Sequence, residues 1–298
     1  MTAAIGRPGP DAADIWLIST DQPAEVLAEL ALLLDPAERR RAAALARPAD
    51  RGRYTAAHGA VREILGCCLG TAPEDLTWER GAHGKPELAG RWTGVRANLS
   101  TCAHLAMLAV TQSRDVGVDL ELVRTDAMAL RMAKRYFPAD EARFVAGPGD
   151  GPDPGSPSGP EFGPEPGPGC GPDLDPRAAA VAVDSLNARP AERFARLWCR
   201  KEACVKAHGA RLAEGLGLPV WEAGPLVVRD PTGALPGACR VRDVPAPIGY
   251  RAAVALGGEQ PFTVRWRVWH GSHDRTADGP GAPPVAVPAP VPVSVSGL

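Results

Sequence analysis

Hydrophobic positions recur along the chain with two spacings, and each predicts one kind of element. Strict alternation or a short apolar run favours a strand, whereas an apolar residue every three to four positions favours an amphipathic helix. Helices are expected at residues 23–34, 53–70, 129–146 with a break near Pro138, and 190–209. Strands are expected at 14–19, 76–80, 225–230, 238–244, 250–256 and 262–269, with two more joined around 112–115 within 95–124.

This succession of elements predicts an α+β protein with two halves of similar size. The N-terminal half spans residues 14–114 and the C-terminal half spans 115–270. The second half contains a Gly/Pro-rich stretch, residues 147–176, whose composition cannot form a packed core and predicts a flexible loop. Residues 1–13 and the Pro/Ala/Val-rich tail at 271–298 are expected to be flexible for the same reason.

Charge and cysteine usage exclude several classes of protein. The 33 basic and 35 acidic residues leave a net charge of −2, which gives no overall field for nucleic acid or a membrane surface. The seven cysteines are scattered without a CxxC pair, which favours buried thiols over disulfides or a zinc site. No apolar run approaches membrane-spanning length, and the N-terminus lacks a secretory signal pattern. We therefore expect a cytoplasmic protein that binds neither nucleic acid nor membranes.

Two acidic residues stand on one face of the expected strand "VGVDLELV". Alternation places Val116, Val118, Leu120 and Leu122 on a buried face, and Gly117, Asp119 and Glu121 on the other. The Cα atoms of the two acids would lie about 7 Å apart, so both carboxylates could bind one hard cation. Gly117 would leave room for a ligand beside them. A solvated acidic strand face is the alternative.

A lysine-poor chain places two lysines on one helix. Only four of the 33 basic residues are lysines, and Lys201 and Lys206 both lie on the helix that begins at Pro190. Glu202 falls at the apolar boundary of this helix, with Lys206 one turn further on. An ordinary Glu-to-Lys pair at this spacing is worth only about 0.3–0.5 kcal/mol. Alternatively, Glu202 could join Asp119 and Glu121 in an oxygen-only site, which suits Mg²⁺ bound to a substrate diphosphate.

The two segments together resemble a known family. "VGVDLE" at 116–121, followed by "WCRKEACVK" at 198–206, resembles the paired signature of the 4′-phosphopantetheinyl transferases. The most similar class is the larger, pseudo-dimeric one that serves nonribosomal peptide and polyketide synthases. The Arg-rich stretch at 35–65, "HGKPEL" at 83–88 and the Asn-x-Ser strand at 97–110 also match the family, and the resemblance extends over residues 14–268.

The resemblance implies a fold and a reaction. Two similar α/β halves, related by a pseudo-twofold, would hold coenzyme A between them in a monomer. The 4′-phosphopantetheine arm would be transferred to a serine of an acyl or peptidyl carrier protein, with release of 3′,5′-ADP. Asp119, Glu121 and Glu202 would then bind Mg²⁺, and Lys206 would stabilise the leaving phosphate. Glu202 would also act as the general base, more easily through a water because metal-bound carboxylates are weak bases.

The resemblance also implies residues that bind coenzyme A. These candidates are Arg41, Arg53, Lys85, Ser100 and Lys201. Each has a plainer interpretation as a solvated charge, a turn residue or a strand-end hydroxyl. One position departs from the family, because Thr101 stands where a histidine usually helps to bind a phosphate of coenzyme A. Threonine carries no positive charge, so the affinity for coenzyme A would be lower unless His104 or an arginine compensates.

Two other functions fit the same residues. The three acids, together with residues that bind phosphate, could form the active site of a Mg²⁺-dependent diphosphatase. Its substrate would be coenzyme A or another nucleotide, and water would be the nucleophile. Alternatively, the protein could be a non-catalytic module that binds coenzyme A or a carrier domain. The three acids and both helix lysines are all present, which argues against a decayed enzyme.

Overall fold

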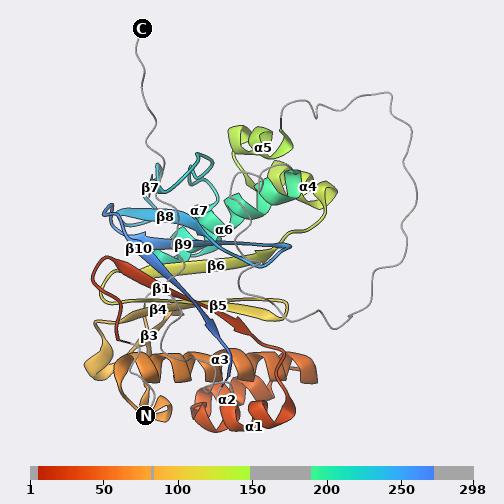
Figure 1. Ribbon diagram of the computed structural model, residues 1–298. Coiled ribbons are helices and arrows are strands. Elements are labelled where there is room, and N and C mark those ends of the chain that lie inside the picture. Colours follow the sequence, from red (N-terminus) through yellow and green to blue (C-terminus); the bar gives the residue numbers. More distant parts are fainter. Residues whose placement is uncertain (1–5, 82–83, 148–188, 272–298) are drawn as a thin grey trace, which may run out of the picture.

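The computed structural model describes residues 6–81, 84–147 and 189–271. It has four layers, with helices outside two stacked sheets (Figure 1). The first sheet has the order β10-β1-β5-β4 and the second β6-β9-β8-β7, while β2 and β3 form a separate hairpin. The strands are β1 Ala12–Ser19, β2 Trp78–Arg80, β3 Pro86–Leu88, β4 Arg96–Cys102, β5 Leu105–Thr111, β6 Val116–Leu122, β7 Leu226–Arg229, β8 Ala238–Val244, β9 Tyr250–Gly257 and β10 Thr263–Trp269.

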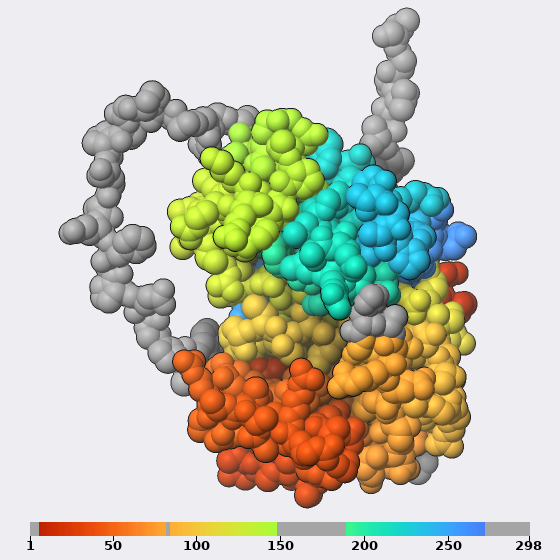
Figure 2. Space-filling model, turned by 180° about the vertical axis from the view of Figure 1, so that it is seen from behind, coloured from red at the N-terminus to blue at the C-terminus, as the bar shows by residue number. Residues whose placement is uncertain are grey.

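Three hydrophobic cores hold these layers together. The helices α1 and α3 cover the outer face of the first sheet, with α2 packed on α3, and α6 with α4 and α5 covers the second (Figure 1). A third core, formed by both sheets, lies between them and contains Ile15, Met107, Val118 and Val254. The helices are α1 Ala24–Leu33, α2 Pro36–Ala43, α3 Pro48–Leu69, α4 Asp126–Tyr136, α5 Ala139–Ala146, α6 Pro190–His208 and α7 Leu212–Gly215. Seen from behind, the red-to-orange segments near the N-terminus lie below the green-to-blue segments (Figure 2).

The α+β class is confirmed, and most expected elements are present with small shifts of their ends. Our expectation of two strands in residues 95–124 was wrong, because three strands are found there. The missed turn joins β4 to β5 at Ala103, which has a φ of 53° and is the one described non-glycine residue with a positive φ. Nothing in the local sequence marks this turn with glycine or asparagine, the residues that usually adopt such a conformation.

The last described strand returns to the first sheet. β10 pairs in parallel with β1, from Ala12 with Thr263 to Ile18 with Trp269. The division at residue 114 had grouped this strand with the C-terminal half. Arg265 anchors it to the fully buried carboxylate of Asp14, with Nη2 2.8 Å from Oδ2. The first sheet is therefore built from both ends of the described chain.

Two of the expected flexible segments lie largely outside the described residues. These are the loop after Gly147 and the tail after Gly271. At the N-terminus, β1 begins at Ala12, two residues before the boundary that we expected. None of the helices in the described part of the chain combines the length and the apolar composition needed to cross a bilayer.

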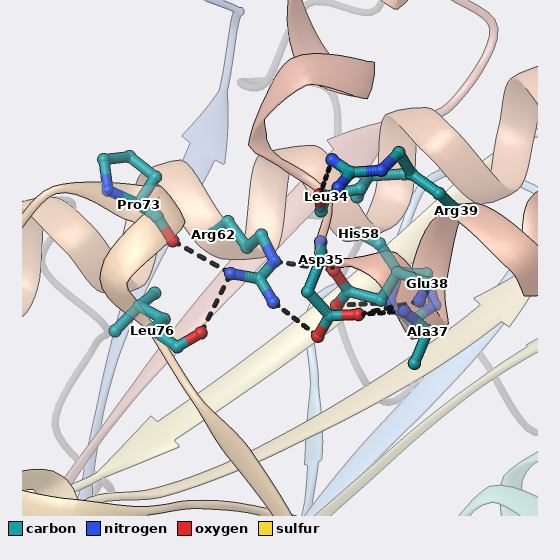
Figure 3. Close-up of polar contacts among 9 residues, drawn as sticks. All are labelled: Leu34, Asp35, Ala37, Glu38, Arg39, His58, Arg62, Pro73 and Leu76. Atoms are coloured by element: carbon teal, nitrogen blue, oxygen red, sulfur yellow. Dashed lines mark hydrogen bonds and ion pairs between the residues drawn. The ribbon is translucent and has the colours of Figure 1, made fainter.

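A buried arginine attaches α2 to α3 (Figure 3). Arg62 is fully buried, and its guanidinium lies 2.8 Å from Asp35 Oδ2 and 2.6 Å from Glu38 Oε2. The same group donates hydrogen bonds to the carbonyls of Pro73 and Leu76, each at 3.0 Å. Asp35 and Glu38 also form a capping box at the start of α2. The position of α2 therefore depends on one side chain of α3.

Replacing this arginine should destabilise the N-terminal half. The Arg62→Met variant is expected to lose about 2 kcal/mol of stability, because both acids and both carbonyls lose a charged partner. Urea denaturation would measure the loss. Arg40→Met, an exposed change on α2, serves as the control. An equally small effect of both variants would show that the Arg62 contacts contribute little.

Candidate active site

The acidic strand β6 and the helix α6 are in direct backbone contact. A side-chain carbon at Gly117 would come within 3.0 Å of backbone atoms of Ala203, Lys206 and Ala207. The expectation that Gly117 leaves room for a ligand was therefore wrong, since the helix backbone occupies that space. Only glycine allows α6 to lie so close to β6. This contact places the other residues on the same face, Asp119 and Glu121, beside α6.

The predicted alternation along β6 is largely confirmed. Val116, Val118 and Leu120 lie in the core between the two sheets. Leu122, at the end of the strand, is 38% exposed and does not belong to this core. The opposite face is covered by α6, so Asp119 is only 3% exposed. The alternative of a solvated acidic face does not apply to Asp119.

Asp119 is the centre of a small polar cluster. Its Oδ1 atom lies 2.6 Å from Lys206 Nζ on α6 and accepts a hydrogen bond from Ser100 Oγ on β4 at 2.9 Å. Lys206 Nζ also lies 3.3 Å from Ser100 Oγ. The second oxygen, Asp119 Oδ2, is buried and has no hydrogen-bond partner in the described structure. One carboxylate oxygen is thus engaged by the protein and the other is left without a donor.

Burial and the charge of Asp119 raise the pKa of the other two acids, Glu121 and Glu202. Burial raises the pKa of Glu121 to about 7, and the nearby Asp119 and Glu202 add to the shift. Burial also raises the pKa of Glu202, with Lys206 lowering it and Asp119 raising it. The pKa of Lys206 is raised because Asp119 and Glu202 outweigh the effect of burial. The fold therefore gathers Asp119, Glu121, Glu202 and Lys206 at the contact between β6 and α6.

The carboxylate oxygens of these acids are of the type that a hard divalent cation prefers, although their side chains are not arranged to coordinate one. Within residues 6–81, 84–147 and 189–271, no three His, Cys, Asp or Glu side chains are already arranged to hold a metal ion. Asp119 Oδ2 is nevertheless a buried acceptor without a hydrogen-bond partner among the described residues, and burial, with the nearby Asp119, raises the pKa of Glu121. A cation with oxygen ligands would add positive charge beside these carboxylates.

The raised pKa of Glu121 predicts a pH-dependent stability. Between about 4.5 and about 7, Glu121 keeps its proton in the folded protein and loses it in the unfolded chain. Because the folded state binds more protons in this window, the stability that Glu121 contributes is present at low pH and is lost as the pH rises. In chelator-treated protein, wild type should therefore lose stability relative to Glu121→Gln between pH 4.5 and pH 7. Urea denaturation at each pH would measure both proteins. A difference in stability between wild type and Glu121→Gln that stays constant with pH would contradict the prediction.

Lys201 is bonded to other parts of the protein. It is fully buried, and its Nζ lies 2.6 Å from Glu141 Oε2 and donates a hydrogen bond to the carbonyl of Leu216 at 2.8 Å. A further bond goes to the carbonyl of Leu218. All three donors of the ammonium are used. The prediction that Lys201 binds coenzyme A is corrected accordingly: it joins α6 to α5 and to the turn after α7.

The other candidates for binding coenzyme A are more widely spread. Lys85 Nζ donates to the carbonyls of Val116 at 2.9 Å and Ala207 at 3.3 Å, and burial lowers its pKa. Arg53, at the start of α3, forms a 2.8 Å ion pair with Asp21. Arg41 is exposed on α2. Of the five candidates, Ser100 is the one in contact with the acidic cluster.

The β4–β5 turn contacts the second sheet. Thr101 is exposed, as is Ala103, and His104 is half-buried. The His104 ring meets the edge of the Tyr250 ring, and Nδ1 lies 3.4 Å from the tyrosine hydroxyl. These contacts join the β4–β5 turn of the first sheet to β9 of the second.

Comparison with known proteins finds similarity to one family. A model described as the 4′-phosphopantetheinyl transferase superfamily matches residues 174–242, which include Glu202 and Lys206. The chain is 38% identical over 129 residues to the 4′-phosphopantetheinyl transferase HetI of Nostoc sp.. Over part of its length, the chain is therefore similar to the 4′-phosphopantetheinyl transferase superfamily.

The similarity to individual members of this superfamily is partial. The match to HetI covers 43% of this chain and 54% of HetI. A second relative, the slr0495 protein of Synechocystis sp., is provisionally named a 4′-phosphopantetheinyl transferase. It is 29% identical over 134 residues, which cover 43% of this chain and 52% of that protein. The chain thus spans about half the length of the curated relatives that it matches.

Proposed function

We propose that the protein transfers the 4′-phosphopantetheine arm of coenzyme A to a serine hydroxyl of an acyl or peptidyl carrier protein, releasing 3′,5′-ADP. The observation that carries this proposal is the gathering of three carboxylates and Lys206 where α6 packs on β6. Similarity to the superfamily supports the same reaction. The family model matches residues 174–242, which include Glu202 and Lys206, while Asp119 and Glu121 lie outside this range and are added by the geometry.

Asp119, Glu121 and Glu202 would hold Mg²⁺. When bound, this cation would neutralise the diphosphate of coenzyme A and polarise the phosphorus that the serine attacks. Without a cation, three neighbouring carboxylates would oppose the binding of a polyanion, since their charges are only partly balanced by Lys206. Asp119 Oδ2 is the natural first ligand because its other oxygen is already engaged.

The proton of the serine hydroxyl must be removed as the new P–O bond forms. Glu202 suits this role because burial raises its pKa, which makes its carboxylate a stronger base than an exposed glutamate. Glu202 would take the proton through a water molecule, because its carboxylate would also bind the cation. Lys206 keeps its proton because of Asp119 and Glu202, so it can stabilise the phosphate of the departing 3′,5′-ADP as a fixed positive charge.

For the arrangement of the halves, the place of coenzyme A and the partner, we propose the properties of the larger, pseudo-dimeric class. The structure has two four-stranded sheets, each with helices on its outer face, and this supports a pseudo-twofold relation between the two layers. Coenzyme A would lie at the junction of the halves, with Arg41, Arg53 and Lys85 as candidates for its phosphates. The protein would act as a cytoplasmic monomer on carrier domains of polyketide or nonribosomal peptide synthases.

Mass spectrometry of a carrier domain tests the proposal. The protein is incubated with coenzyme A, Mg²⁺ and an apo carrier domain, and the carrier is then weighed. A mass gain of one phosphopantetheine arm, absent without Mg²⁺, is expected. Cleavage of coenzyme A without any carrier would instead indicate a diphosphatase, and binding of coenzyme A with neither product would indicate a non-catalytic module.

A further inference from the structure

The two sheets meet at their edge strands through side chains. β4 is the edge of the first sheet and β6 the edge of the second. The backbone N–H of Val118 donates to Asn98 Oδ1 at 2.9 Å, and the N–H of Leu120 donates to Ser100 Oγ at 3.3 Å. Two side chains that are two residues apart on β4 therefore satisfy two N–H groups that are two residues apart on β6. They take the place of a backbone ladder between these edges.

The residue between the two bonded N–H groups is Asp119. Ser100 makes a second contact there, because its hydroxyl donates to Asp119 Oδ1 at 2.9 Å. Lys206 Nζ reaches the same carboxylate oxygen at 2.6 Å. The hydroxyl of Ser100 thus fixes both the backbone after Asp119 and the carboxylate itself. Asp119 Oδ2 is the oxygen that these contacts leave free.

We infer that Asn98 and Ser100 are positioning residues, which hold β6 so that Asp119 offers Oδ2 to the cation. This inference rests on the proposed function, and it changes the role first expected for Ser100. Asn98 acts through the backbone of Val118, and Ser100 acts through both the backbone and the carboxylate. Groups that orient a metal ligand typically change metal affinity by about 10–100-fold when they are removed.

Hydrogen exchange tests the first half of the inference. The amide of Val118 should exchange faster in Asn98→Ala, and the amide of Leu120 should exchange faster in Ser100→Ala. Asn98→Asp and Ser100→Thr keep an accepting oxygen at each position, so both amides should stay protected in these variants. Unchanged exchange in the two alanine variants would overturn the inference, because the bonds would not hold β6 in solution.

Metal affinity tests the second half, with Mn²⁺ as a paramagnetic probe in place of Mg²⁺. Electron paramagnetic resonance measures the binding of Mn²⁺ to each free protein. We expect Ser100→Ala to weaken binding by about tenfold, Asn98→Ala by a few-fold, and Ser100→Thr by less than about twofold. Wild-type affinity for Mn²⁺ in both alanine variants would also overturn the inference. It would mean that these hydrogen bonds stabilise the fold without orienting the metal ligand.

The outcome is separable from that of the proposed function. A wild-type protein that binds Mn²⁺ but never modifies a carrier would refute the transferase, while the ranking of the variants would still decide the inference. A wild-type protein that modifies carriers, with unaltered Mn²⁺ binding in the alanine variants, would refute the inference alone.

Discussion

The Glu202→Gln variant should transfer phosphopantetheine about 10²–10⁴-fold more slowly than the wild type, while keeping its fold. Glutamine has the shape of glutamate but cannot take a proton from serine, and it removes one of the three charges meant for the cation. Glu202 is close enough to Asp119 and Lys206 for both to shift its pKa. Single-turnover mass gain of an apo carrier domain would measure the loss.

The control for this variant is Glu79→Gln, the same change at an exposed position of β2. It should leave the rate unaltered. Circular dichroism and denaturation curves would show whether Glu202→Gln is folded. Full activity in a folded Glu202→Gln protein would remove Glu202 from the mechanism.

Gly117→Ala should both destabilise the protein and remove its activity. The added methyl group would be within 3.0 Å of backbone atoms of α6, and backbone cannot turn aside as a flexible side chain can. We expect a loss of at least about 3 kcal/mol, at the upper end of what overpacking costs. The displaced helix carries Glu202 and Lys206, so transfer should fall even in conditions where the variant remains folded.

Gly94→Ala is the matched control. A side-chain carbon at Gly94 would meet no atom within 4 Å, and its φ is not in the left-handed region. Stability and rate should therefore stay near those of wild type. A Gly117→Ala protein as stable as this control would show that α6 can move away from β6 at little cost.

Much of the fold could be predicted from sequence because its signals are local. The alternation along β6 and the apolar stripe of α6 are patterns within short stretches. The helix α2 was missed although its signal is present, since Asp35, Pro36 and Glu38 form a capping box with proline in the first turn. The Ala103 turn gave no such signal, because its conformation is imposed by the pairing of β4 with β5.

The site was harder to predict because it depends on contacts between distant segments. Lys201 and Lys206 share a motif, yet five residues on a helix turn them towards different neighbours. One lies against Glu141 of α5 and the other against Asp119 of β6. The role of Asn98 depends on β4 meeting β6 edge to edge, and no local pattern specifies that. The resemblance to the family pointed to acidic residues that lie close enough to shift one another's pKa, but it could not separate the two lysines.

The return of β10 to the first sheet sets the order in which the protein can fold during translation. β1 leaves the ribosome before its parallel partner, residues 263–269, which is made some 250 residues later. Until then, the nascent chain carries an unpaired strand edge and the buried carboxylate of Asp14 without Arg265. A chaperone that shields the N-terminal half would have to remain bound until nearly the whole described chain has been synthesised.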